Sequence, residues 1–299
     1  MSNKCNTNTP CCNLIYFDIL IVQEMSTKLI MGGAMCCCSC VCLMFFIGFI
    51  GYVYMKTNVF GNNPMCTDSL PGNCITTDGL IGMYDASEKS YKKGKTEWKD
   101  LSGKKNHAQI KPTCKIDKDD GGWVTGKQED WVVFPEGILL ENDDYTLVHV
   151  SRYNGKNATR ERIFVGKKHT DNWLSGFWKK RTGVSHQGGI SWITEQDTKK
   201  ANKEPLISIQ HRGAYRTDNY EMVEHPNADS AVTPNELGIN IWTNSDNNAY
   251  IETSDWAVGM VLIYNRRLKE SEVNVIVQVL AAKYKVELED VETNSDDDD

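Results

Sequence analysis

The stretch YTLVHVSR (145–152) decides the fold, because its side chains alternate along it in two sets. A period of two is the period of a β-strand, so the two sets lie on opposite faces of a sheet. The two sets are Tyr145, Leu147 and His149 on one face, and Thr146, Val148 and Val150 on the other. The stretch therefore predicts a strand and, with it, a body built on sheets.

Runs of strand length lie on both sides of this stretch, separated by turn-forming dipeptides. The runs are 131–134, 162–165, 206–210, 237–243 and 258–264, and the turn signals are Asn154-Gly155, Gly188-Gly189, Arg212-Gly213 and His225-Pro226. Short strands without alternating helices are typical of an antiparallel sandwich or barrel. A body of about 210 residues suits one two-sheet sandwich, so the predicted fold class is mainly β.

One helix is expected near the C-terminus, where apolar residues recur at three-and-four spacing. They are Val273, Ile276, Val277, Leu280 and Tyr284. Ser271 is a candidate N-cap for this helix. A helix in this place is expected to pack across the sandwich and close it.

The charge of the chain is concentrated at its end. The 299 residues carry a net charge of −7, and the segment 287–299 holds eight acids and no base, so the remaining body is nearly neutral at +1. A near-neutral body excludes a strongly basic nucleic-acid binder. The segment 287–299 is expected to be a disordered, solvated tail, and a basic partner is the alternative.

The segment 29–55 predicts a transmembrane helix. It contains no ionisable side chain other than cysteines and two tyrosines, and Lys28 and Lys56 flank it. At 1.5 Å per residue this length spans a hydrocarbon core of about 30 Å. The expected order is a short N-terminal segment (1–28), the helix, a linker (56–75) rich in Gly, Asn and Pro, the sandwich (76–286) and the tail. Membrane lipid is thus an expected partner through 29–55.

Cysteines and a sequon bear on orientation. Five cysteines in the first half of the span invite S-acylation from the cytosolic side, although Cys also serves there as a small apolar residue. Cys66 and Cys74 are a disulfide candidate in an oxidising space, which leaves Cys114 unpaired. Asn157 begins the chain's one glycosylation sequon. Together these features favour a single-pass protein with its N-terminus on the inner side of the membrane and its C-terminal domain on the outer side.

Two end motifs carry a resemblance to a known family. The opening GLIGMYDAS (79–87), WKDLSG (98–103) and NHA (106–108), with the closing SDWAVGMVLIYNR (254–266) and its helix 270–284, resemble concanavalin A-like (laminin-G-like) lectin/glucanase domains. The middle piece NWLSGFW (172–178) is similar to versions of the domain in large DNA viruses of algae. The resemblance covers 76–286 and implies a jelly-roll sandwich that binds glycan or protein. From the residues alone, Asp100 and Ser102 set a turn and Trp98 is a core anchor.

The motifs of catalysis are missing from the sequence. Catalytic relatives carry a Glu-x-Asp-x-Glu strand, and the nearest match here, Glu195-Gln196-Asp197-Thr198-Lys199, ends in a lysine. We therefore expect no enzyme, although acids distant in sequence can still meet. No cofactor is expected. Calcium is an optional ligand that relatives often bind, and the candidate residues are Asp117, Asp119, Asp120, Asp143 and Asp144. Solvated turns are the alternative explanation for these acids.

The best candidate ligand surface lies in the segment 173–215. Sugars bind to aromatic faces flanked by planar hydrogen-bonding groups. The candidates are Trp173, Trp178, Arg181, His186, Trp192, His211, Arg212 and Tyr215, with packing in the core as the alternative role for the aromatic residues. The predicted function is recognition or adhesion, through glycan or protein, at a membrane or virion surface. The alternatives are a structural virion protein that links coat proteins to an inner membrane and, third, a glycan hydrolase.

Overall fold

The computed structural model describes residues 74–139, 144–156, 158–166, 172–195, 205–218, 221–241 and 252–288. The chain divides into two compact units, 1–63 and 64–299, and all described residues belong to the second. The predicted transmembrane span 29–55, the segment 1–28, most of the linker and the tail beyond residue 288 lie outside the described residues. Within the described ranges, no helix is long and apolar enough to cross a membrane.

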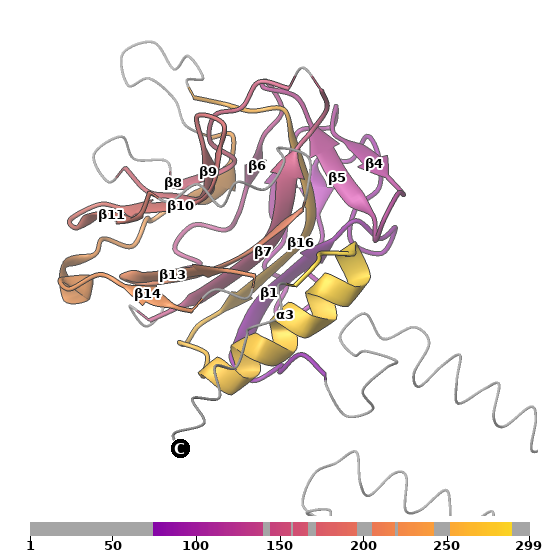
Figure 1. Ribbon diagram of the computed structural model, residues 1–299. Coiled ribbons are helices and arrows are strands. Elements are labelled where there is room, and N and C mark those ends of the chain that lie inside the picture. The colour runs from indigo at the N-terminus through magenta and orange to yellow at the C-terminus, as the bar shows by residue number, and fades with distance from the viewer. Residues whose placement is uncertain are drawn as a thin grey trace, which may run out of the picture. The chain divides into compact units, whose positions relative to one another are not determined.

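The body is a sandwich of two antiparallel sheets, as expected (Figure 1). The first sheet has the order β14 (Val223–Glu224), β13 (Ala214–Thr217), β12 (Leu206–His211), β7 (Thr146–Tyr153), β16 (Trp256–Tyr264), β5 (Trp123–Gly126) and β4 (Lys115–Asp117). Strand β1 (Leu80–Asp85) pairs with the C-terminal half of β16, whereas β5 pairs with its N-terminal half. Strands β7 and β16 lie at the centre of this sheet, and the sequence predicts strands at both places, over 145–152 and 258–264.

The second sheet has eight shorter strands. Their order is β11 (Ser191–Thr194), β10 (Arg181–Gln187), β9 (Leu174–Trp178), β8 (Phe164–Gly166), β15 (Leu237–Ile239), β6 (Val132–Val133), β3 (Ala108–Ile110) and β2 (Glu97–Trp98). A short 3-10 helix, η2 (Ala228–Ser230), lies between β14 and β15. The strand predicted over 237–243 ends at residue 239 among the described residues, and its last two positions lie outside them.

The main core fills the space between the two sheets. Rings from both sheets meet there: Phe134 lies 5.1 Å from Tyr84 and 6.4 Å from Phe164, measured between ring centroids. Trp98 is fully buried and donates from Nε1 to the Asp85 carbonyl at 2.8 Å, which confirms its predicted role as an anchor. The alternation of 145–152 is also confirmed, because Leu147 belongs to this core while Val148 and Val150 face the opposite side.

The predicted helix is α3 (Glu270–Tyr284), and it covers the outer face of the first sheet (Figure 1). All five apolar residues that predicted it are buried. Its predicted cap is wrong: the N-cap is Lys269, not Ser271. Glu272 accepts a hydrogen bond from the Lys269 backbone N–H at 2.9 Å, so this carboxylate satisfies the helix start and Ser271 stays exposed.

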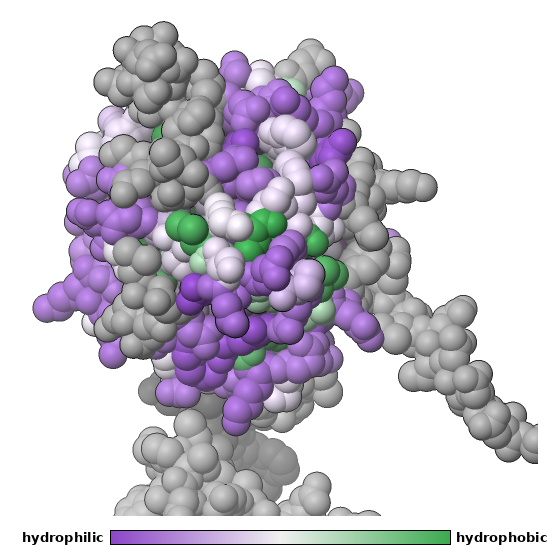
Figure 2. All heavy atoms as spheres, turned by 90° about the vertical axis from the view of Figure 1, so that its left-hand side faces the viewer, coloured by the Kyte–Doolittle hydropathy of each residue, from purple (hydrophilic) through white to green (hydrophobic). Residues whose placement is uncertain are grey.

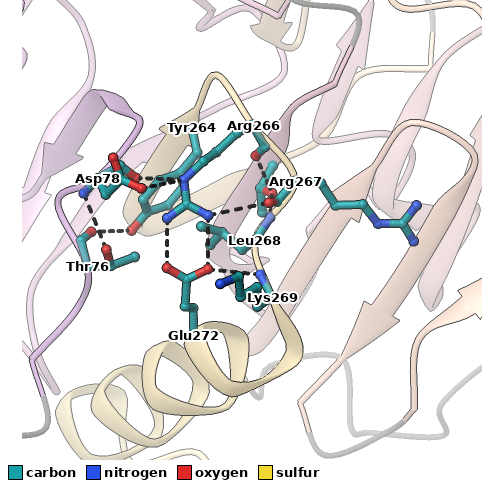
Figure 3. Close-up of polar contacts among 9 residues, drawn as sticks. Thr76, Asp78, Tyr264, Arg266, Arg267, Leu268, Lys269 and Glu272 are labelled. Carbon is teal, nitrogen blue, oxygen red and sulfur yellow. Dashed lines mark hydrogen bonds and ion pairs between the residues drawn. The ribbon is translucent and has the colours of Figure 1, made fainter.

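Where β16 leads into α3, a polar cluster fastens the start of the domain (Figure 3). Arg266 forms two hydrogen bonds to the Glu272 carboxylate, at 2.9 and 2.7 Å, and a third to the Asp78 carbonyl at 3.2 Å. The Tyr264 hydroxyl donates to the Thr76 carbonyl at 3.0 Å. The chain that follows the predicted linker is thus bound to the last strand and the helix.

The turn at 100–106 has the structural role expected from its sequence. The Asp100 carboxylate accepts from the backbone N–H groups of Met83, Ser102 and Asn106, at 2.9, 2.8 and 3.0 Å. It also accepts from the Ser102 hydroxyl at 2.8 Å. These four hydrogen bonds engage both carboxylate oxygens in holding the turn.

Candidate functional site

The candidate site starts at the hairpin between β9 and β10. Its two loop residues, Lys179 and Lys180, both have positive φ, 45° and 68°. Positive φ at both central residues is the geometry that matches the twist of a two-residue hairpin, and Gly or Asn usually supplies it. The hairpin places Trp178 directly opposite Arg181. Turn residues alone do not predict this hairpin, because two lysines take the place of the usual Gly and Asn.

Three rings gather on the outer face of β9, β10 and β11, and we call Trp178, His186 and Trp192 the aromatic platform. The Trp178 and Trp192 ring centroids lie 4.9 Å apart, and His186 meets Trp192 edge-on at 4.9 Å. All three side chains are half-buried. Beneath the two tryptophans lie the buried side chains Val165, Leu174, Val184 and Ile241. The tryptophans are thus fixed at their inner edges and accessible at their outer ones.

Cations flank the platform. The Lys179 ammonium lies 4.7 Å from the centroid of the Trp178 ring, and the Arg181 guanidinium lies 5.6 Å from it. Carboxylates neutralise both in part, since Lys179 Nζ is 3.8 Å from Glu252 Oε1 and Arg181 Nη1 is 3.7 Å from Glu195 Oε2. A cation within about 6 Å of a ring face is favourable, so both residues help to hold Trp178 in place.

A chain of polar groups runs beside the platform, and we call Glu252, Arg162, Asn172 and His186 the polar chain. Arg162 donates to Glu252 Oε2 at 2.6 Å and to Asn172 Oδ1 at 2.8 Å. His186 Nδ1 donates to the Asn172 carbonyl at 2.5 Å, so Nε2 of the neutral ring accepts from Asn172 Nδ2 at 3.3 Å. Burial, together with the nearby Arg162 charge, lowers the pKa of His186 below its usual value. The imidazole is therefore neutral and fixed in orientation at neutral pH.

Two carboxylates lie near this chain of polar groups. Burial, and to a smaller extent the Glu252 charge, raises the pKa of Glu161. The Glu252 carboxylate is engaged by Arg162 and Lys179, and the Trp178 Nε1–H donates to it at 3.4 Å. Hydrolysis needs one carboxylate as acid and a second as nucleophile or base. Glu252 is committed to holding Arg162 and Trp178, so its observed contacts are those of a positioning group.

The structure brings four of the eight predicted ligand residues together and separates the other four. Trp178, Arg181, His186 and Trp192 share the outer face of β9–β11. Three predictions are wrong as surface residues: Trp173 is fully buried in the main core, and His211 and Tyr215 are each 1% exposed. Arg212 lies in the β12–β13 hairpin and donates to the carbonyls of Ala231 and Asp229, at 3.0 and 2.7 Å.

The space between the sheets explains two of these corrections, those of Trp173 and Tyr215. Trp173 Nε1 donates to the Tyr145 hydroxyl at 3.3 Å, and the Tyr215 hydroxyl pairs with Ser208 Oγ at 2.9 Å. Each polar end thus finds a partner inside the sandwich, where the ring buries its area. Arg212 instead fastens the segment around η2 to the first sheet. Trp173 and Tyr215 therefore do not lie on the outer face of the second sheet, and His211 lies with Ile207 and Ile209 on the α3 side of the first sheet.

The remaining candidate residues are those for calcium binding, glycosylation and a disulfide bond. Asp117 lies 3.7 Å from Arg152, and Asp120 pairs with Lys285 at 2.5 Å, so cations already face two of the calcium candidates. No group of three or more metal-binding side chains occurs among the described residues. Asp143, Asn157 and Cys66 lie outside those residues. Cys74 is disulfide-bonded, and Cys114 is free and buried.

The side of the domain seen in Figure 2 is mostly hydrophilic, with small and separate apolar patches. Among the described residues, the large apolar side chains that are exposed are Val223 (46%) and Val232 (37%), both near η2. A ligand on this side therefore meets scattered apolar groups within a polar surface.

Comparison with known proteins gives distant structural neighbours. No family model and no curated protein matches the chain. Among solved structures, it is similar to Trypanosoma rangeli sialidase (TM-score 0.48, 16% identity), over 79% of this chain and 38% of that one. It is also similar to the binding domain of Paraclostridial Mosquitocidal Protein 1 (TM-score 0.49, 12% identity), over 67% of this chain and 52% of that one. A third similar structure is the binding domain of Botulinum neurotoxin DC, solved with rat synaptotagmin II (TM-score 0.46, 11% identity), over 69% of this chain and 52% of that one. The chain thus spans 38% of the sialidase and 52% of each of the two binding domains.

Proposed function

We propose that this chain is a membrane-anchored, non-catalytic recognition protein whose sandwich binds glycan through the aromatic platform. The observation that carries the proposal is the pair of half-buried tryptophans, Trp178 and Trp192, packed 4.9 Å apart on an outer sheet face. Half-exposed tryptophans supply the flat apolar surface on which the apolar side of a sugar ring stacks. The apolar stretch 29–55 is the proposed anchor, with the domain outside the membrane.

The groups beside the platform supply the polar half of the recognition. His186 is neutral and fixed by Asn172, and Arg181 projects next to Trp178 with 42% of its side chain exposed. Both ring nitrogens of His186 are bonded to Asn172, so a ligand hydroxyl can pair with the Arg181 guanidinium while the fixed imidazole contacts the ligand at little entropic cost. This division into an apolar floor and a few convergent polar groups is typical of small-ligand sites.

The test is a glycan array probed with the full chain in detergent micelles. We expect sugar-dependent binding, and a loss of about tenfold or more in affinity for Trp178→Ala and for Trp192→Ala, which is about 1.4 kcal/mol or more. The matched control is Trp131→Ala, because Trp131 belongs to the same outer-face cluster without belonging to the platform. The control should retain binding.

Three other results would contradict the proposal, each in a different way. Equal losses for Trp131→Ala and Trp178→Ala would move the site along the sheet, away from the platform. A silent array together with tight binding to viral coat proteins would replace glycan recognition by the structural virion role. Glycan turnover that disappears in Glu161→Gln would replace recognition by hydrolysis.

A further inference from the structure

A lysine-rich loop lies at the opposite edge of the second sheet from the aromatic platform. The segment 87–95 joins β1 to β2, and β2 and β11 are the two edges of that sheet. We call its four exposed lysines, Lys89, Lys92, Lys93 and Lys95, the lysine loop. The segment holds one acid, Glu88, and none of the four lysines has an ion pair with any described residue. In a body with almost no net charge, this loop is a concentrated positive surface.

The backbone of the lysine loop is held firmly. Tyr91 is fully buried and donates from its hydroxyl to the Cys114 carbonyl at 3.1 Å. Ser90 Oγ donates to the Lys99 carbonyl at 2.7 Å, and Asp85 Oδ1 accepts from the Ser87 N–H and hydroxyl, at 2.9 and 2.6 Å. The four lysines are therefore carried by one fixed segment of backbone, and the repulsion among their like charges favours binding of an anion.

The C-terminal end of α3 lies next to the base of this loop. A Cβ on Gly121 would meet the Lys283 carbonyl oxygen at 2.7 Å, and one on Gly122 would lie 3.4 Å from Ala86 Cβ, just before the loop. Lys285, the C-cap of α3, pairs with Asp120 at 2.5 Å, and Lys118 lies 3.8 Å from Glu88. In Figure 1 this end of α3 points toward the β4–β5 end of the first sheet. The turn 117–122 thus connects the helix end to the lysine loop.

The segment that leaves α3 has the complementary charge. From residue 289 to 299 the chain carries seven acids and no base. Extended at about 3.3 Å per residue, these residues reach roughly 36 Å, which exceeds the length of a nine-residue strand such as β16. Two acids of the intervening turn, Asp117 and Asp120, are already paired with Arg152 and Lys285, so they compete little for the free lysines.

We propose that the acidic segment 289–299 docks on the lysine loop of its own chain. Its carboxylates pair with Lys89, Lys92, Lys93 and Lys95 and cover the positive surface against other polyanions. Each exposed pair is weak, but the attachment at α3 gives the acids an effective concentration on the order of millimolar. The contact is therefore expected to depend strongly on salt. It is independent of the glycan proposal, because the platform lies at the other edge of the sheet.

Zero-length coupling with a carbodiimide tests this contact in the full chain, because it joins an amine to a carboxylate only when the two touch. We expect couplings from 289–299 to the lysine loop to exceed those to Lys127 and Lys269 by about fivefold, and to vanish when salt at about 1 M shortens the Debye length to about 3 Å. Lys127 and Lys269 are exposed lysines elsewhere on the domain. A mixture of isotopically heavy and light chains distinguishes couplings within one chain from those between two.

Neutral variants give a second measurement. The quadruple change of Asp296, Asp297, Asp298 and Asp299 to Asn should increase retention of the full chain on dextran sulfate, because it uncovers the lysines. Adding Lys89→Gln, Lys92→Gln, Lys93→Gln and Lys95→Gln to that variant should abolish the increase. Couplings spread evenly over all exposed lysines, couplings mainly between chains, or identical retention with the acidic and the neutral tail would each overturn the proposal.

Discussion

The outer faces of the two sheets differ in what covers them. On the first sheet, α3 buries Val148, Met260 and Leu262 beneath Ile276 and Leu280. On the second sheet no described helix packs, and Trp178 and Trp192 remain half-exposed above a small apolar cluster. Among the described residues, one face is thus covered by a helix, whereas the other presents half-exposed aromatic and polar side chains.

The two faces are therefore expected to have different roles: the first contributes to stability, and the second is proposed to bind a ligand. An amphipathic helix that covers a sheet face stabilises the fold by burying apolar area, and the residues on that face must pack well. A face left open keeps aromatic rings accessible and must fix them by other means. Here Lys179, Arg181 and the polar chain of Glu252, Arg162, Asn172 and His186 provide this support. Substitutions on the two faces should therefore affect different measurements.

The largest effect on stability is expected from Ile276→Ala on the closed face. Ile276 is fully buried between α3 and the first sheet, so its truncation leaves a cavity. Such changes cost about 2–5 kcal/mol of unfolding free energy. Urea denaturation of the full chain, followed by tryptophan fluorescence, measures the loss, and glycan binding by the folded fraction should be unchanged. A smaller loss than that of Trp178→Ala would contradict the division between the faces.

The next largest effect on stability is expected from a buried histidine in the core between the two sheets. His149 on β7 is fully buried and bonds Ser151 at 2.8 Å and Ser175 of the second sheet at 3.0 Å, and burial lowers its pKa to about 3. The unfolded chain binds a proton below its pKa of 6.5 and the folded chain does not, so stability falls as the pH drops from about 6.5 toward 3. The slope per histidine is at most about 1.4 kcal/mol per pH unit.

Comparing the full chain with His149→Asn at pH 7 and pH 5 isolates this contribution. The variant should lose about 2 kcal/mol less between these pH values. His211, whose pKa burial also lowers to about 3, remains in both proteins and keeps part of the dependence. Identical pH slopes in the two proteins would show that His149 takes up its proton without unfolding the domain.

The features that depend on residues close together in the sequence could be predicted, whereas contacts between residues far apart in the sequence could not. The alternation of 145–152 and the spacing of the helix residues are local signals, and both faces they predicted are confirmed. Trp173 and Trp178 lie five positions apart, an odd number that places them on opposite faces of a strand. The odd spacing predicts that one of the two side chains points outward, but it does not predict which one. Glu252 lies 74 residues beyond Trp178 in the sequence, so its contact with that ring leaves no local signal.

On the open face, a smaller effect on stability and a larger one on binding are expected from Glu252→Gln. The variant loses the charge that faces Arg162, whose side chain is only 7% exposed, but keeps an acceptor for its hydrogen bond. The loss in unfolding free energy should be about 1–2 kcal/mol. Affinity on the glycan array should fall, because the loss of the opposing charge weakens the position of Arg162 and, through it, of Asn172 and His186. An unchanged affinity would separate the polar chain from ligand recognition.

The smallest effect compares two neighbouring positions at the start of the helix that closes the first face. Glu272 accepts two hydrogen bonds from Arg266 and one from the Lys269 N–H, and Arg266 lowers its pKa to about 2 (Figure 3). Its contribution is therefore complete above about pH 4.5 and is lost as the pH falls through about 2. Glu272→Gln should cost about 1 kcal/mol at neutral pH, because the pair is partly exposed, and less at high salt. Ser271→Ala, the control, should stay within about 0.5 kcal/mol, since Ser271 is exposed and does not cap the helix. The reverse order in thermal denaturation would restore Ser271 as the cap and remove Glu272 from the stabilisation of the closed face.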